Sequence, residues 1–130
     1  MKESVMLTIA SLLSIIFLTF HLADDIVLGM EKGGLSNLIA VPILVTWLYG
    51  TLVLAERRSG YVIMLIGSIL AFGMPVIHVT GSRGLFAGQF TKYSGAFLFF
   101  WSFFVLGISG IFSFVLSAQA LWGQRSGQPR

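Results

Sequence analysis

The sequence contains no cysteine and few charged residues. The lack of cysteine excludes disulfides, thiolate metal sites and cysteine nucleophiles. Lys, Arg, Asp and Glu make up 10% of the 130 residues, whereas soluble domains contain about 25%. Eight basic and five acidic side chains give a formal net charge of +3 and form no basic stripe. We therefore expect no nucleic-acid partner.

The motifs of several enzyme classes are missing as well. The chain has no GxSxG, no HExxH and no phosphate-binding glycine loop followed by Lys-Ser or Lys-Thr. Serines are plentiful, but none has a neighbouring base that would make it a nucleophile. These absences argue against serine hydrolases, HExxH metalloproteases and P-loop nucleotide-binding proteins.

Apolar residues fill almost the whole chain. They make up 56% of it, and the mean hydropathy is +0.92. Four apolar stretches cover residues 5–28, 36–55, 61–79 and 94–121. A hydrocarbon core of about 30 Å requires roughly 20 helical residues. The sequence therefore predicts an all-α integral membrane four-helix bundle embedded in a lipid bilayer, with one transmembrane domain (1–122) and a flexible polar tail (123–130).

The distribution of basic residues predicts the orientation. Four spans place both termini on one side of the membrane, together with the link between the second and third spans. That side holds Lys2, Arg57, Arg58, Arg125 and Arg130. The other side holds Lys32, Arg83 and Lys92, together with Asp24, Asp25 and Glu31. The positive-inside rule therefore predicts cytoplasmic termini and a multi-pass protein of the bacterial inner (plasma) membrane.

Small and polar residues recur at helical spacing within the predicted spans. Ser109, Ser113 and Ser117 stand one turn apart on the last span, and Gly67 and Ala71 form a small-xxx-small pair on the third. On the second span the corresponding face is Pro42, Thr46, Tyr49 and Gly50. Small residues let helix backbones approach each other in lipid. We interpret these stripes as packing faces, with the aromatic residues of 97–104 crowding the other sides of the last span.

The first span differs because its polar face becomes ionisable. His21 and Asp25 are four residues apart and share a helix face, whereas Asp24 lies toward its flank. The uninterrupted apolar run from Val5 to Phe20 has a length of only about 24 Å at 1.5 Å per residue. The helix must therefore continue through Leu28 to cross a membrane. This continuation draws His21 into the outer part of the bilayer.

The third span brings the second histidine to the same level. Odd-numbered spans run in the same direction, and His78 lies near the outer end of the third one. His21 and His78 are therefore predicted to lie within about one helical turn of each other in depth.

Imidazole and carboxylate ligands together suit Zn, Cu, Fe or Mn. His21, Asp25 and His78 are the predicted ligands of a divalent transition-metal ion, and Asp24 or Glu31 supplies a fourth ligand or orients an imidazole. Two histidines at matching depth also permit haem b held between His21 and His78. A polar cluster with no ligand, and proton transfer or quinone contact, remain alternative interpretations.

Two further functional hypotheses do not depend on this cluster. The chain can be a non-catalytic accessory subunit that docks through its small-residue faces, either in a larger membrane complex or on a second copy as a homo-oligomer. It can also be a minimal small-molecule transporter with Thr46, Tyr49 and the serines lining a path. Its length and helix count are similar to those of the small multidrug resistance family, but that family uses a glutamate deep in its first helix, where this chain has only Ser11 and Ser14.

Overall fold

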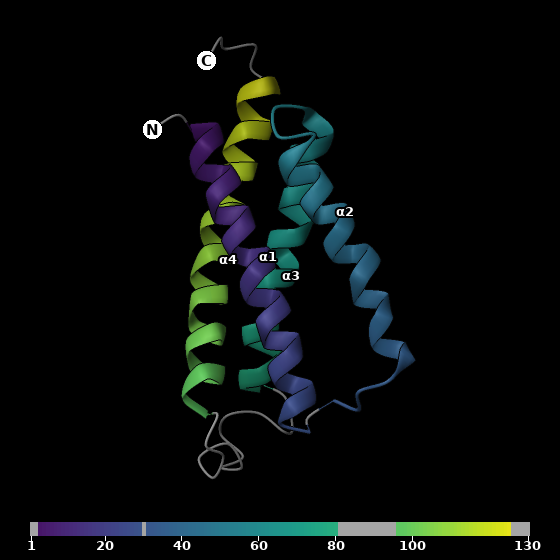
Figure 1. Ribbon diagram of the computed structural model, residues 1–130. Coiled ribbons are helices and arrows are strands. Elements are labelled where there is room, and N and C mark those ends of the chain that lie inside the picture. Colours follow the sequence, from purple (N-terminus) through teal and green to yellow (C-terminus); the bar gives the residue numbers. More distant parts are fainter. Residues whose placement is uncertain (1–2, 30, 81–95, 126–130) are drawn as a thin grey trace.

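The computed structural model describes residues 3–29, 31–80 and 96–125, and all regular secondary structure among them is helical. The long helices are α1 (Glu3–Val27), α2 (Ala40–Leu52), α3 (Arg58–Thr80) and α4 (Ala96–Arg125), and a short 3-10 helix, η1 (Leu35–Ile39), leads into α2. The start of α1 and the end of α4 lie at the same end of the bundle (Figure 1). We call this the termini end and the opposite one the far end. The predicted all-α, four-helix fold is confirmed.

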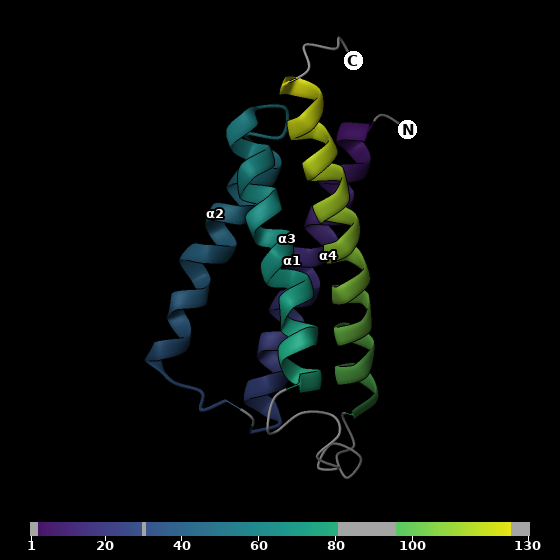
Figure 2. The same ribbon diagram turned by 180° about the vertical axis from the view of Figure 1, so that it is seen from behind.

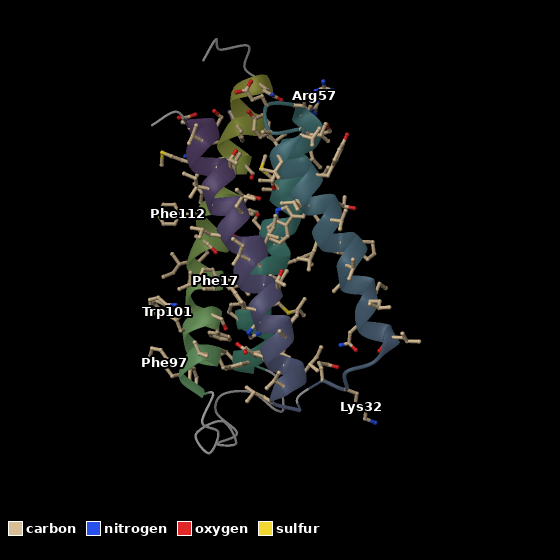
Figure 3. All side chains as sticks on the ribbon, viewed as in Figure 1. Phe17, Lys32, Arg57, Phe97, Trp101 and Phe112 are labelled. Carbon is tan, nitrogen blue, oxygen red and sulfur yellow. The ribbon has the colours of Figure 1, made fainter. Side chains whose placement is uncertain are left out.

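Four helical segments are long and apolar enough to cross a membrane. They are Glu3–Val27, Leu35–Leu52, Arg58–Thr80 and Phe97–Gln124, with mean hydropathies of 2.2, 1.6, 2.2 and 2.1. Large apolar side chains cover the outside of the bundle. Phe97, Trp101 and Phe112 point away from the other helices (Figure 3) and are 76%, 53% and 58% exposed. Such a surface suits lipid and fits a multi-pass membrane protein.

Helix α4 packs extensively on both α3 and α1, and these two contacts are the largest between helices. Close approach between α3 and α4 depends on Gly110, where an added Cβ would lie 2.9 Å from the Cβ of Ala71. Gly67 serves the same purpose between α3 and α2, because an added Cβ there would overlap the Trp47 ring. The predicted packing faces of the third and fourth spans are therefore confirmed at Gly67, Ala71 and the serines of α4, which are all buried.

Helix α2 packs on α3 and α1 near the termini end and diverges from them toward the far end (Figures 1 and 2). The face predicted for this span is wrong except at Gly50. Pro42, Thr46 and Tyr49 are exposed, whereas Trp47, Gly50 and Thr51 are buried. The physical reason is Trp47, whose large ring fits over Gly67 and whose Nε1–H donates a hydrogen bond to Ser11 Oγ at 2.9 Å. Burying this side chain sets the rotation of the helix.

The helix ends differ from the predicted ones by a few residues. Helix α1 ends at Val27 and is followed by Gly29 in the left-handed conformation with φ of 70°, a common way to terminate a helix. Helix α4 continues through residues 123–125, which were predicted as part of the tail. A glycine inside a helix, such as Gly123, costs only about 1 kcal/mol. Residues 81–95, including most of the predicted link after the third span and the predicted start of the fourth, and residues 126–130 lie outside the described part of the chain.

Candidate metal site

Three ionisable side chains converge at the far end of the bundle. His21 and Asp25 share one face of α1, and His78 comes from the last turn of α3. Each offers a ligand atom, and these atoms all lie within 4.8 Å of one another. The structure thus brings together three of the five residues that the sequence suggested as ligands. The parallel course of α1 and α3 produces this convergence.

The distances within this group leave space for a cation. His78 Nε2 lies 3.5 Å from Asp25 Oδ1, and His21 Nε2 lies 3.9 Å from Asp25 Oδ2. Both distances exceed the roughly 2.7–2.9 Å of a charge-assisted hydrogen bond. Ligand atoms that are each about 2.1 Å from one ion lie no more than about 4.2 Å apart. The two His–Asp25 distances are below this limit. The widest separation between ligand atoms in the group is at most 4.8 Å, which exceeds the limit by no more than about 0.6 Å.

Burial makes unpaired polar atoms in this group costly. His21 is 0% exposed and Asp25 is 4% exposed, whereas His78 is partly buried. Both ring nitrogens of His21 and Oδ1 of Asp25 are buried and lack a hydrogen-bond partner. Leaving one such atom unpaired costs about 1–3 kcal/mol. Buried charged groups are normally paired or bound to a metal, so these atoms are available as ligands.

A backbone hydrogen bond fixes the orientation of His78. Its Nδ1 lies 3.0 Å from the Met74 carbonyl oxygen. A carbonyl can only accept, so Nδ1 carries a proton and donates to Met74. Nε2 faces Asp25 Oδ1, to which the protonated ring donates, whereas the neutral ring presents there a lone pair that a metal ion can bind. Metal-binding histidines commonly donate their second ring N–H to such a carbonyl.

Two phenylalanines of α4 enclose the imidazoles. The Phe99 ring centroid lies 5.0 Å from that of His21 and 6.0 Å from that of His78. The corresponding distances for Phe103 are 6.1 and 6.4 Å. Sequence reasoning did not single out these two residues among the many aromatics of this span. The available signal was their helical spacing, because 99, 102, 103, 106 and 109 follow the same inward face as the buried serines.

Asp24 lies beside the three converging residues rather than among them. It is partly buried, and its Oδ2 lies 3.4 Å from Ser102 Oγ, whose single proton also has a nearer acceptor, the Phe99 carbonyl oxygen at 3.0 Å. Because successive helix residues are rotated by about 100°, Asp24 faces α4 while Asp25 faces α3. Asp24 therefore contacts α4 next to the site.

The arrangement does not fit haem b between the two histidines. Their ring centroids are only 4.8 Å apart and the rings meet edge to face, which leaves no room for a macrocycle between them. Asp25 also faces the Nε2 atoms of both rings. A single ion is the ligand that this geometry accommodates.

Two imidazoles and one carboxylate are ligands suited to Zn²⁺, Fe²⁺ and other divalent transition metals. Three protein ligands also leave at least one coordination position open on such an ion. No protein-family model, curated protein or solved structure matches the chain significantly.

Proposed function

We propose that this protein is an integral membrane protein that binds one divalent transition-metal ion through His21, Asp25 and His78. The observation that carries the proposal is the convergence of these three side chains from two helices, with ligand atoms within 4.8 Å of one another. Their burial inside a bundle of four apolar helices supports a site within the membrane-spanning part of the chain.

A bound cation accounts for the geometry better than a cluster without a ligand. Asp25 lies too far from either imidazole for a short charged hydrogen bond, and His21 has no hydrogen-bond partner at either ring nitrogen. A metal ion satisfies the carboxylate and both imidazoles at once. The His78–Met74 hydrogen bond keeps the proton of the neutral ring on Nδ1, which leaves Nε2 as the atom that can bind a metal.

The proposed orientation puts the termini in the cytoplasm of a bacterial cell and the metal site near the outer surface of the inner membrane. Arg57 lies at the termini end and Lys32 at the far end (Figure 3). Arg57 and Arg58 form the compact basic link that the positive-inside rule assigns to the cytoplasm. The ion would then reach His21, Asp25 and His78 from the outer side.

The structure supports a binding site better than a continuous transport path. Between the site and the termini end, the interior is apolar at Leu18 and Leu106, which are 4% and 0% exposed. Thr46 and Tyr49, the residues suggested to line a path, lie on the exposed face of α2.

Elemental analysis of detergent-purified protein tests the proposal. We expect about one equivalent of a transition metal per chain after purification without chelator and dialysis against the candidate ions. His21→Ala and His78→Ala should each lose it. Thr80→Ala is the matched control, because Thr80 is an exposed residue at the same end of α3 whose hydroxyl bonds only the Val76 carbonyl among the described contacts. A metal-free wild type, or equal metal content in all four proteins, would contradict the proposal.

A further inference from the structure

A second polar group lies in the half of the bundle nearer the termini. Its members are Ser11 and Ser14 on α1, Thr51 on α2, and Ser109, Ser113 and Ser117 on α4, which we call the hydroxyl cluster. Ser109 is 6% exposed and the other five are 0% exposed. Hydroxyl groups buried this deeply normally have hydrogen-bond partners, so each proton can be followed to its acceptor.

The protons on the α2 side of the cluster are all used. Thr51 Oγ1 donates to the Trp47 carbonyl at 2.9 Å. The 2.7 Å contact between Ser11 Oγ and Thr51 Oγ1 must then use the Ser11 proton. Ser11 in turn accepts a hydrogen bond from Trp47 Nε1 at 2.9 Å. The Ser11 and Thr51 hydroxyls both donate their protons in hydrogen bonds, and each oxygen can accept a further hydrogen bond.

The α1–α4 contact is similar. Ser109 Oγ donates to the Leu106 carbonyl at 3.2 Å. Ser14 Oγ lies 3.1 Å from Ser109 Oγ and 2.9 Å from the Ala10 carbonyl, and donates toward them. The protons of both hydroxyls are again used, while their oxygens retain acceptor capacity.

Ser113 and Ser117 break this pattern. They lie one and two turns beyond Ser109 on the same face of α4, and the Oγ atom of each is buried without a hydrogen-bond partner. Two buried O–H donors are therefore unsatisfied on the face of α4 that also carries Ser109, and the Ser109 oxygen, like those of Ser11, Ser14 and Thr51, can still accept. Water both donates and accepts, and it commonly bridges buried polar groups of this kind.

We propose that the hydroxyl cluster is an internal water-binding site, with Ser113 and Ser117 donating to water that bridges to the hydroxyls nearer α1 and α2. No acidic, basic or histidine side chain is among the cluster's members, so a neutral ligand fits better than an ion. The cluster ends at Ser14, about 10 Å along α1 from His21. The buried Leu18 and Leu106 lie between the two sites, so hydration of the cluster does not depend on the proposed metal.

Solid-state NMR of the isotope-labelled full chain in liposomes tests this directly, by measuring magnetisation transfer from water to individual residues. We expect transfer at Ser113 and Ser117, and none at Leu18, Leu106 or the exposed Ile111. The double variant Ser113→Ala, Ser117→Ala should lose the transfer at Ser14 and Ser109. Ser68→Ala is the control, because buried Ser68 already donates to the Leu65 carbonyl at 2.7 Å, and it should leave the transfer unchanged.

Two results would overturn the proposal. Absence of transfer at Ser113 and Ser117 would show that their hydroxyls donate to backbone carbonyls one turn earlier on α4, without water. Transfer at Ser14 and Ser109 that persists in the double alanine variant would show that these two hydroxyls do not hold the water. The measurement gives the same answer with or without added metal, so failure of the metal proposal would remain separate.

Discussion

Asp25 is the central residue of the candidate site, because its two carboxylate oxygens face different histidines. Oδ2 lies 3.9 Å from His21 Nε2 and Oδ1 lies 3.5 Å from His78 Nε2. Asp24, its neighbour in sequence, instead lies 3.4 Å from the Ser102 hydroxyl of α4. Two adjacent aspartates therefore have different surroundings, and comparing them separates a ligand from a nearby charge.

Replacement of Asp25 by Asn should weaken metal binding far more than the same replacement of Asp24. Groups that only support a metal ligand typically change the affinity by about 10–100-fold. We expect Asp25→Asn to lower the metal affinity by more than about 100-fold, and Asp24→Asn to lower it by about 10-fold or less. Competition titration with a chromophoric chelator measures both. Similar losses in the two variants would mean that the site responds to charge alone.

Among the helices, α3 contacts each of the other three and packs closely on α2 and α4 through small residues. Gly67 receives the Trp47 ring of α2, and Ala71 meets Gly110 of α4. Gly73 lies on the same helix with no atom within 4 Å of the position that its Cβ would take. Close packing is therefore required at Gly67 and not at Gly73.

Alanine at these two glycines should have opposite effects on stability. In an open helical position, Gly→Ala favours the helix by up to about 1 kcal/mol. At Gly67 the new methyl group overlaps Trp47, and overpacking of this kind typically costs about 1–3 kcal/mol. We expect Gly73→Ala to raise and Gly67→Ala to lower the unfolding temperature measured by circular dichroism in detergent. A stabilised Gly67→Ala variant would contradict the described contact between α2 and α3.

Sequence spacing predicted the buried faces of α3 and α4 and the shared face of His21 and Asp25 on α1, but it failed on α2. Serines and small residues marked the inward sides of α3 and α4 because small residues favour close helix contacts in lipid. Helix α2 follows another rule, in which one large side chain, Trp47, is buried over a glycine of its neighbour. Phe99 and Phe103 were missed for a related reason. They are aromatic, as are the exposed Phe97, Trp101 and Phe104, so residue type does not distinguish them. Only their position relative to the serines of α4 does.

In the molecule as a whole, the two polar groups lie in different halves of the bundle. The hydroxyl cluster lies nearer the termini and the His/Asp group lies at the far end, with Leu18 and Leu106 between them. Counting helical residues was enough to predict that His21 and His78 have similar depths. It did not establish that they touch, because contact requires α1 and α3 to be lateral neighbours, and helix lengths carry no information about that.

The absence of cysteine makes the proposed orientation directly measurable. Ser36 lies in η1, before α2, and Ser59 lies in the first turn of α3, and both are exposed. We expect a membrane-impermeant maleimide to label Ser36→Cys on intact cells. Ser59→Cys should react only after the cells are permeabilised. The reverse pattern would place the His/Asp group on the cytoplasmic side.

X-ray absorption spectroscopy at the edge of the bound metal tests directly whether His21, Asp25 and His78 coordinate it. We expect a first coordination sphere containing two imidazole nitrogens and at least one carboxylate oxygen, with metal–ligand distances of about 2.0–2.2 Å. His78→Ala, which should lose the ion, should show none of this imidazole scattering. A spectrum of an ion coordinated by water alone, or one unchanged in His78→Ala, would contradict a metal site built from His21, Asp25 and His78.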